Sequence, residues 1–383
     1  MQASDRTIPI DGQRGPYGPL LWAALIAVVI GCQPVLSPRE SGVTPTATNP
    51  ASEPAPTRLE HTGSSPTLVG TPIAATDLRG RIVFDDFEDL FAMNVDGSEL
   101  VTLAGSTKGP EFDGAWSPDG RRIVYRDSTR GINQDDEIFI VRSDGSGRRN
   151  LTNDPANDWG PDWSADGKTI AFNSTREGEM RGFLVDPDGK NLRRMNVDAW
   201  VEYPSFSPDG TKIAYMGALG SNYELFIADL VSGEVTRLTQ SPGHDGWPAW
   251  SPDGTTIAFS SVRDDCRFTP RDRECWRSGD IGEYFDIWLI DVDGTNLRRV
   301  TSEFGQFVAW SPDSAYLLIS GYGLYVLRPD GTGRRELRTD GIPRALGGIP
   351  DWHWPARPRR FSRPGRRRPR RRARARRPRS WSS

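Results

Sequence analysis

A five-residue motif recurs along this chain at a nearly regular interval. Its copies read WSPDG, WSADG, FSPDG, WSPDG and WSPDS, and they begin at Trp116, Trp163, Phe206, Trp250 and Trp310. Successive copies therefore lie 47, 43, 44 and 60 residues apart. Runs rich in β-branched and aromatic residues precede and follow each copy, which predicts four short strands per repeat. Four strands in roughly 40–50 residues are typical of one blade of a β-propeller.

We call this segment the turn motif, because its residue types suit a tight connection between two strands. Pro presets a turn dihedral angle, Asp caps the turn through its carboxylate, and Gly adopts the positive φ that closes the hairpin. The aromatic residue that opens the motif ends a strand, and we expect its ring to pack between neighbouring blades. The six residues expected in this structural role are Trp116, Trp163, Phe206, Trp250, Trp310 and, in the last strand, Trp352.

The two ends of the repeat region complete each other. Three strand-like runs begin at Arg81, Leu90 and Leu100 without a turn motif before them, while the run IPDWHWP, residues 349–355, has no strand after it. A C-terminal strand that completes the N-terminal blade closes a ring of six and leaves no sheet edge exposed. We therefore predict an all-β fold, a six-bladed β-propeller of four-stranded blades formed by residues 81–355.

These repeats resemble those of the TolB-type β-propeller family, whose WD-like repeats carry the W-S-P-D-G signature, and the resemblance covers about 275 of the 383 residues. The family's periplasmic Tol protein has an α/β domain before its propeller. Residues 33–80 of this chain are instead crowded with Pro, Thr, Ser and Ala and lack a hydrophobic period, which predicts a disordered tether. The resemblance implies the propeller fold in a form without that domain. Similar propellers also precede the hydrolase domain of prolyl oligopeptidase-type enzymes.

The first 32 residues predict export. Arg6 and Arg14 precede the apolar run PLLWAALIAVVIG, which is short for a membrane span and suits the h-region of a secretory signal. The run ends in VIGC, which resembles the cleavage box of bacterial lipoproteins, in which Cys32 is diacylated and becomes the mature N-terminus. An uncleaved signal-anchor is the alternative. We expect an exported lipoprotein held in the membrane by Cys32, at the periplasmic face of the envelope or at the cell surface.

Two cysteines remain once Cys32 is lipidated. Cys266 and Cys275 lie nine residues apart in a charged insertion, and an even remainder in an exported protein predicts a disulfide. A bridge over so short a loop stabilises by roughly 2–3 kcal/mol in the chain-entropy model. It would shape this loop and would not hold the core.

The formal net charge of −3 conceals two regions of opposite charge. Residues 356–383 contain 14 Arg and no acid, which leaves 34 basic against 51 acidic residues, a charge of −17, in residues 1–355. Such a tail has too little to bury to fold and is predicted to be disordered. Three interpretations stay open: the tail grips an anionic polymer or lipid headgroups, it lies against the acidic propeller, or it has no selected role. No nucleic-acid partner is expected, because the export signal conflicts with one.

The sequence contains no recognisable catalytic or metal motif. It has no G-x-S-x-G segment, and its three histidines form no local cluster with one another or with cysteines. The segments DPDGKN at Asp186 and DVDGTN at Asp291 begin like calcium loops, but position twelve is Val197 in one and Ser302 in the other instead of Glu. We predict no cofactor, no metal and no covalent chemistry. The alternatives are a lyase or hydrolase that uses channel carboxylates and a structural component of the envelope.

An arginine follows the second predicted strand of three repeats, at Arg130, Arg176 and Arg263. Many acidic residues lie near these positions, and guanidinium geometry suits carboxylate pairing. We interpret the arginines as partners in salt bridges between blades or within loops, in preference to ligand binding.

The predicted ring sorts the connections onto two faces. The turn motifs lie on one side, the motif face, and the longer loops and blade-to-blade connections lie on the other, the loop face. Varied loops on a rigid scaffold are where propellers usually bind, so we predict recognition of a protein, peptide or glycan at the loop face. The candidate rim consists of Trp159, Trp200, Tyr203, Trp247, Asp158, Glu202, His244 and Asp245. Alternatively these aromatic rings only fill space between blades, the interpretation we prefer for Trp247.

Overall fold

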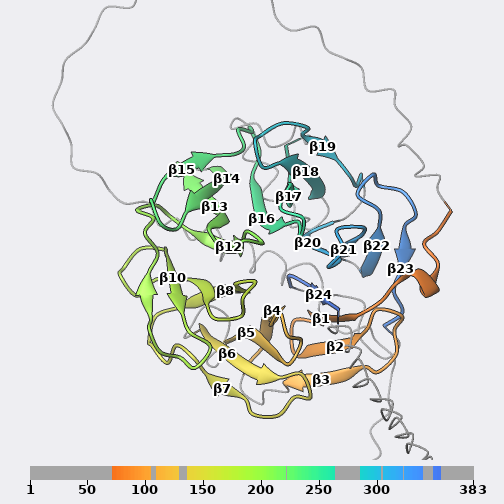
Figure 1. Cartoon of the computed structure of the whole chain (residues 1–383), viewed down its shortest axis with the longest axis horizontal. Coiled ribbons are helices and arrows are strands. Elements are labelled where there is room, and N and C mark those ends of the chain that lie inside the picture. The colour runs from red at the N-terminus through yellow and green to blue at the C-terminus, as the bar shows by residue number, and fades with distance from the viewer. Residues whose placement is uncertain are drawn as a thin grey trace, which may run out of the picture.

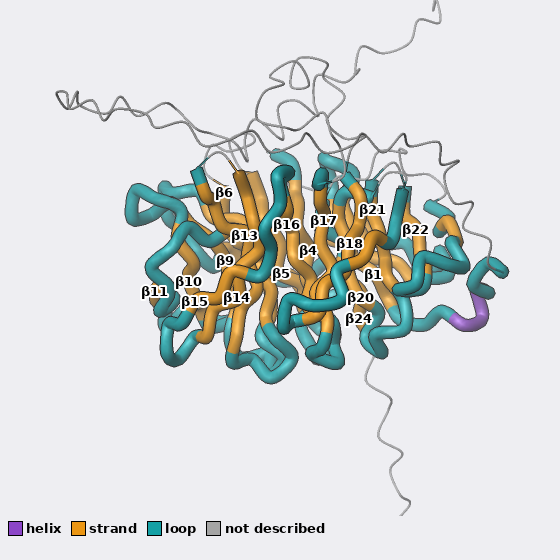
Figure 2. Tube along the Cα trace, turned by 90° about the horizontal axis from the view of Figure 1, so that it is seen from above, coloured by secondary structure: helices purple, strands orange, loops and turns teal. Residues whose placement is uncertain are grey.

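The computed structural model describes residues 71–104, 109–128, 136–220, 222–263, 285–302, 305–321, 323–339 and 348–354. These residues form six four-stranded antiparallel sheets, which stand as blades around a central channel (Figure 1). Seen from the side, the strands run between the motif face and the loop face of the ring (Figure 2). The prediction of a six-bladed propeller is confirmed. Cys32, Cys266, Cys275, Arg130 and the Arg-rich tail lie outside the described residues.

The strands of each blade follow one another outwards from the channel, and the chain passes from each blade to the next. Blade 1 contains β24 (Asp351–His353), β1 (Arg81–Asp85), β2 (Leu90–Asn94) and β3 (Val101–Ala104). Blade 2 contains β4 (Glu111–Trp116), β5 (Arg122–Ser128), β6 (Asp136–Arg142) and β7 (Arg149–Asn150). Blade 3 contains β8 (Asp158–Trp163), β9 (Ile170–Ser174), β10 (Arg181–Val185) and β11 (Arg193–Arg194).

The second half of the ring repeats this order. Blade 4 contains β12 (Glu202–Phe206), β13 (Lys212–Leu219), β14 (Asn222–Asp229) and β15 (Val235–Arg237). Blade 5 contains β16 (Asp245–Trp250), β17 (Thr256–Ser261), β18 (Asp286–Asp291) and β19 (Arg298–Arg299). Blade 6 contains β20 (Phe307–Trp310), β21 (Leu317–Ser320), β22 (Leu324–Leu327) and β23 (Arg335–Glu336).

The C-terminal strand β24 closes the ring by completing the N-terminal blade. It pairs antiparallel with β1, with Trp352 opposite Ile82, and it contacts β20 of blade 6 and β4 of blade 2. The indole of Trp352 is buried, and its Nε1 donates a 2.8 Å hydrogen bond to the carbonyl oxygen of Arg79. The predicted closure is therefore present, and both ends of the repeat region are held in one blade.

The packed body begins before the first strand. Ile73 is fully buried, its N–H donates to the carbonyl of Gly333 at 3.0 Å, and its own carbonyl accepts from Arg335 at 3.0 Å. The three-residue 3₁₀ turn η1 (Ala75–Asp77) follows. Residues 71–80, which the composition assigns to the tether, thus pack on blades 6 and 1. The composition missed them because the burial of one or two apolar side chains leaves no periodic pattern. Among the described residues, no helix is long and apolar enough to cross a membrane.

The turn motif is held by its serine as well as by its aspartate. In the first copy, Ser117 Oγ donates to Asp119 Oδ1 at 2.7 Å and accepts the N–H of Arg122 at 2.9 Å. This small network closes the hairpin with side-chain partners for the exposed backbone groups. The same serine–aspartate pair occurs in the other copies, as Ser164–Asp166, Ser207–Asp209, Ser251–Asp253 and Ser311–Asp313.

The last residue of the turn motif occupies the left-handed region of backbone conformation. Gly120 has a φ of +65° and lies directly against the imidazole of His353, so that a Cβ at this position would collide with Nε2. In the variant copy WSPDS, Ser314 adopts a φ of +59°. The chain therefore keeps the turn geometry without glycine in that blade, at some cost in backbone strain.

The apolar core lies between neighbouring blades rather than in a single central layer. Trp116 of blade 2, for example, packs with Val83 and Leu90 of blade 1 and with Ile123 and Tyr125 of its own blade. The other aromatic residues that open the turn motifs occupy corresponding clusters. Each blade is thus stabilised by burying apolar surface against the next, which makes the closed ring the stable unit.

Replacement of Trp352 tests the closure. Trp352→Ala removes a buried side chain that joins β24 to the first blade, and we expect it to lower the free energy of unfolding by roughly 4 kcal/mol. The measurement is denaturant unfolding followed by circular dichroism. Trp354→Ala, two residues further on and half-buried, is the matched control and should cost less than half as much. Equal losses in the two variants would contradict the role given to β24.

Candidate functional site

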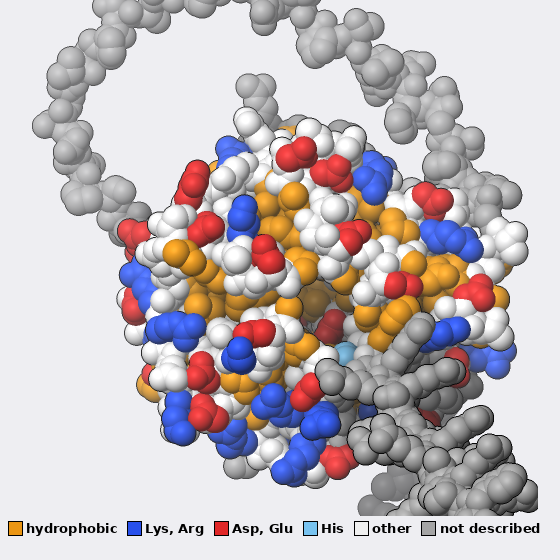
Figure 3. Space-filling view, viewed as in Figure 1, with side chains coloured by type: hydrophobic (Ala, Val, Ile, Leu, Met, Phe, Trp, Pro, Cys, Tyr) orange, Lys and Arg blue, Asp and Glu red, His pale blue; other side chains and the backbone are white. Residues whose placement is uncertain are grey.

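The innermost strands enclose a cavity of about 330 Å³ at the motif face of the channel. Much of its lining consists of tryptophan and proline residues from the turn motifs and the strands before them, including Pro118, Trp163, Pro252 and Trp310. Figure 3 shows this ring of hydrophobic side chains around a central hollow, with acidic side chains inside it and a histidine at its edge. The cavity is therefore apolar at its mouth and acidic within.

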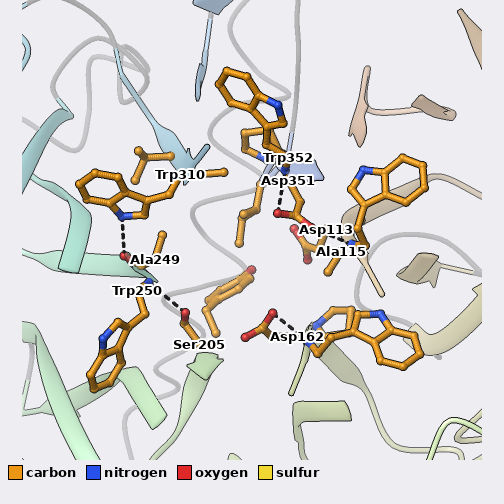
Figure 4. A pocket seen from close by; sticks show the side chains of 18 of the residues that line it. Asp113, Ala115, Asp162, Ser205, Ala249, Trp250, Trp310, Asp351 and Trp352 are labelled. Carbon is orange, nitrogen blue, oxygen red and sulfur yellow. Dashed lines mark hydrogen bonds between the residues drawn. The ribbon is translucent and has the colours of Figure 1, made fainter. Parts of the chain in front are cut away.

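The residue directly before each motif aromatic faces this cavity and in three blades fastens the next blade. Asp351 Oδ2 accepts the N–H of Trp116 at 2.7 Å, and Asp162 Oδ2 accepts the N–H of Phe206 at 2.7 Å. Ser205 Oγ accepts the N–H of Trp250 at 3.1 Å. Asp162, Ser205 and Asp351 point inward from different sides of the channel (Figure 4).

A β-bulge interrupts four of the innermost strands two residues before that inward-facing position. Asp113, Gly160, Tyr203 and Trp247 each lie three residues before a motif aromatic, and each has a positive φ, between +47° and +57°. The pairing of the innermost strand shifts register at each of these positions. A bulge of this kind inserts one residue and redirects the side chains around it. Positive φ in Tyr and Trp is costly, and such strain is often found at functional sites.

A cluster of aromatic rings packs behind the cavity-lining residues Tyr203 and Ile349. Trp247 lies at right angles to Phe307, with ring centroids 5.2 Å apart, and 6.0 Å from the ring of Tyr203. Ile349 of the closing segment packs against the same cluster. These four residues come from four blades, so they meet across the channel. The cavity is therefore backed by an aromatic cluster, and the acid Asp113 belongs to its lining.

A buried arginine lies behind Asp113. Arg126 Nη1 is 3.8 Å from Asp113 Oδ2, its Nε is 3.3 Å from Asp136 Oδ2, and its side chain is 5% exposed. Its guanidinium also lies 4.8 Å from the centroid of the Phe112 ring. Each charged group here has a charged partner, which is the condition for burying a guanidinium.

Burial raises the pKa of the carboxylates that line the cavity. The pKa of Asp162 rises to about 7 because of burial, although the N–H of Phe206 acts in the opposite direction. The pKa of Asp351 rises to about 6 for the same reason, opposed by the N–H of Trp116. Burial also raises the pKa of Asp113, opposed by Arg126. At pH 7 Asp162 is near the midpoint of its titration and Asp351 is mostly ionised, and a cation in the cavity would favour the ionised form of each carboxylate.

Among the described residues, those that line the cavity include no Lys or Arg. Three carboxylates, the hydroxyls of Ser205 and Tyr203, and a ring of tryptophan and proline therefore define what can enter. Such a lining suits an extended segment with apolar or basic side chains, because aromatic faces and carboxylates both attract guanidinium and ammonium groups. A volume of this size is at the low end for ligand pockets and holds only a few side chains.

The aromatic residues predicted for the loop-face rim have different surroundings. Trp159 Nε1 donates to Asp136 Oδ2 at 2.5 Å, and Trp200 Nε1 donates to Glu202 Oε1 at 2.5 Å, and both indoles are half-buried. Tyr203 is one of the residues that line the motif-face cavity. Trp247 is 8% exposed and packs with Phe285 and Phe307.

The predicted polar rim residues are mostly engaged within their own blades. Asp158 and Asp245 are buried and pair with Arg176 at 2.8 Å and Arg263 at 2.5 Å. His244 is half-buried, and its Nδ1 accepts the N–H of Tyr223 at 3.1 Å. Burial lowers the pKa of His244 to about 4. The salt-bridge interpretation of Arg176 and Arg263 agrees with these distances.

Glu202 is the exception among the polar rim residues. Its carboxylate is 2% exposed, and burial raises its pKa to about 8, while the hydrogen bond from Trp200 acts in the opposite direction. A carboxyl group in this state is neutral at pH 7.

The cavity acids Asp113, Asp162 and Asp351 were absent from the predicted site. Their signal lies in the offsets from the motif aromatic: one residue before it for Asp162 and Asp351, three before it for Asp113. An alignment of the six inner strands on their aromatic residues brings these positions into register. Among the described residues no group of three or more His, Cys, Asp or Glu is arranged to hold a metal ion.

Comparisons with known proteins agree with this architecture. A family profile for the TolB beta propeller domain matches residues 84–203. The protein TolB homolog of Chlorobium luteolum is 33% identical over 156 residues, 39% of this chain and 33% of that protein. Dipeptidyl-peptidase 5 of Porphyromonas gingivalis is 25% identical over 340 residues, 59% of this chain and 48% of that protein. TolB from Acinetobacter baumannii shares the fold with a TM-score of 0.57 at 20% identity, over 71% of this chain and 66% of that one.

The fold and the site define a closed six-bladed β-propeller with an acidic cavity at one mouth of its channel. In its turn motif, in the profile match over residues 84–203 and in its relatives, this propeller is similar to those of TolB-type proteins. It spans about a third to a half of the length of these two curated relatives.

The neutral state of Glu202 predicts how stability depends on pH. The folded-state pKa of about 8 lies above the unfolded value of about 4.3, so this group contributes stability at low pH that is lost as the pH rises toward 8. Glu202→Gln keeps an oxygen that can accept the bond from Trp200 and removes the titration. We expect the variant to melt about 5 °C above the parent at pH 9 and within 1 °C of it at pH 4.5.

Thermal melts of both proteins across this pH range measure the difference. Asp198→Asn, at a carboxylate that is 91% exposed, is the control and should leave the pH profile unchanged. A constant difference between Glu202→Gln and the parent at every pH would show that the carboxyl does not titrate in this range.

Proposed function

We propose that this protein is a non-catalytic binding protein of the bacterial envelope. In this proposal Cys32 carries the lipid that tethers the chain to the membrane, and the propeller receives a segment of a partner protein at the motif-face cavity. The observation that carries the proposal is the lining of that cavity, a tryptophan and proline ring above Asp113, Asp162 and Asp351, without a basic side chain among the described residues.

The size and shape of the cavity favour a segment of chain as the ligand. A volume of about 330 Å³ admits a few side chains and excludes a folded domain. Prolines precede the inward-facing residue in several inner strands, as Pro161, Pro204, Pro248 and Pro350, and they present flat apolar surface that adds no N–H donors of its own. An extended peptide with aromatic, aliphatic or basic side chains complements this surface.

The bonding of the cavity acids favours binding over catalysis. Asp162 accepts N–H groups on both oxygens, from Phe206 and from Trp163, and Asp351 does the same with Trp116 and Trp352. Carboxylates engaged in this way position blades and have little freedom to transfer a proton to a substrate. The similarity to dipeptidyl-peptidase 5 covers less than half of that enzyme, and this chain contains no G-x-S-x-G segment. A carboxylate-dependent lyase or hydrolase is therefore the second choice.

Capture experiments locate the binding face. The full-length protein is used to pull partners from native envelope extract, and a captured protein is identified and its affinity remeasured with purified components. We expect Asp162→Asn to weaken that affinity at least tenfold, because it removes a buried charge from the cavity. Asp198→Asn, a surface acid on the loop face, should have no effect.

The same assay tests the loop face. Trp159→Ala and Trp200→Ala remove two of the predicted rim residues and should leave the affinity within twofold of the parent. If these two variants lose the partner while Asp162→Asn keeps it, recognition takes place at the loop face and the cavity proposal is wrong. Thermal melting of each variant separates lost binding from lost folding.

A further inference from the structure

The end of the described chain lies at the edge of the cavity. His353 of β24 lines the cavity, and the indole of Trp354 donates from Nε1 to the carbonyl of Arg79 at 2.6 Å. The described chain therefore ends at Trp354, at the motif face and beside the mouth of the channel. The segment that follows, residues 356–383, contains 14 Arg and no acid.

The cavity and this segment are complementary in charge. The lining offers Asp113, Asp162 and Asp351 and no described Lys or Arg, and residues 1–355 carry a formal charge of −17 against +14 in the tail. Buried carboxylates with raised pKa gain most from a cationic neighbour, since a guanidinium supplies donors and charge together. The tryptophan ring at the mouth adds faces on which guanidinium groups can stack.

Covalent attachment strengthens such an interaction. A segment joined to the rim by a few residues has an effective concentration near its site in the millimolar range, so even a weak intrinsic affinity gives high occupancy. The first arginines, Arg357, Arg359 and Arg360, follow Trp354 by three to six residues. At about 3.5 Å per extended residue, this spacing lets them turn over the rim and enter the cavity.

We propose that the Arg-rich segment 356–383 occupies the motif-face cavity of its own propeller, with Arg357, Arg359 and Arg360 beside the cavity carboxylates. The inference rests on the proposed function, because a segment in this position competes with the partner for the same cavity. Binding of the partner then requires release of the tail, which makes the tail an autoinhibitory element.

The test uses a fluorescein-labelled synthetic peptide of residues 356–383 as probe, with fluorescence polarisation as readout at physiological salt. We expect the chain that ends at residue 355 to bind the probe at least tenfold more tightly than the full-length protein, whose own tail fills the cavity. In the shortened chain, Asp162→Asn should weaken probe binding at least tenfold and Asp198→Asn less than twofold. Equal binding by the full-length and shortened chains overturns the proposal.

Two full-length variants of equal net charge separate docking from general attraction. The first carries Arg357→Gln, Arg359→Gln and Arg360→Gln, and the second carries Arg374→Gln, Arg376→Gln and Arg377→Gln. The first should bind the probe like the shortened chain and the second like the parent, because only the first loses the arginines near the rim. Equal effects of the two triple substitutions overturn the proposal, and this result does not depend on any change within the folded propeller.

Two further arms address the membrane and the proposed function. If the full-length protein binds phosphatidylglycerol vesicles as tightly as the free tail peptide does, the tail is not held in the cavity and the inference is wrong. If the probe behaves as expected but no form of the protein captures a partner, the docking is supported and the proposed function is contradicted. If a partner is captured equally by the full-length and shortened chains, the autoinhibitory role is contradicted while the proposed function stands.

Discussion

Closure of the ring by β24 is the constraint on which the rest of the propeller depends. Each blade buries its apolar face against the next, so an open ring would leave one blade with an exposed edge and an exposed core face. The last strand removes both, because it pairs with β1 and sends Asp351 to the N–H of Trp116 in blade 2. The same short strand also forms part of the wall of the cavity. Stability and the site are therefore built on one element.

The inner strands show how a repeated backbone can present different side chains. The turn motif holds every hairpin in nearly the same way, whereas the residues one and three positions before the aromatic differ from blade to blade. At those positions the ring carries acids in some blades, and small or aromatic residues in others, such as Ser205, Trp247 and Phe307. The bulges place Tyr203 and Trp247 in strained backbone conformations with positive φ. Regularly repeated blades therefore surround the cavity with side chains that differ in charge and polarity from blade to blade.

The acids of the channel couple binding to stability. Asp162 and Asp351 hold neighbouring blades together through backbone N–H groups, yet burial raises the pKa of each of them toward neutrality. A cationic group in the cavity would relieve the cost of ionising these carboxylates and would stabilise the folded ring by mass action. A basic segment, whether from a partner or from this chain, is therefore the kind of ligand that these carboxylates bind favourably.

Much of the fold was predictable, because its determinants are local. The turn motif and the strand runs are short-range patterns, and the unpaired runs at Arg81 and near Trp352 indicated closure. The site was less predictable. Asp113, Asp162 and Asp351 are far apart in the sequence and meet only in the ring, and a one-residue bulge decides which side chains face the channel. Composition also placed residues 71–80 in the tether, since Ile73 has no periodic neighbours to reveal its burial.

The sequence by itself determined the number of blades and the structural role of the motif aromatics, because each repeat is a local pattern. It also indicated the closing strand, because three strand-like runs at one end and one at the other together make a single blade. The tertiary structure alone decided that the cavity opens at the motif face and that Trp247 packs behind its lining residue Tyr203. It also decided that Asp158 and Asp245 form salt bridges with Arg176 and Arg263. The reason is physical: burial, charge pairing and the direction of a side chain at a bulge arise from contacts between blades, which no local pattern contains.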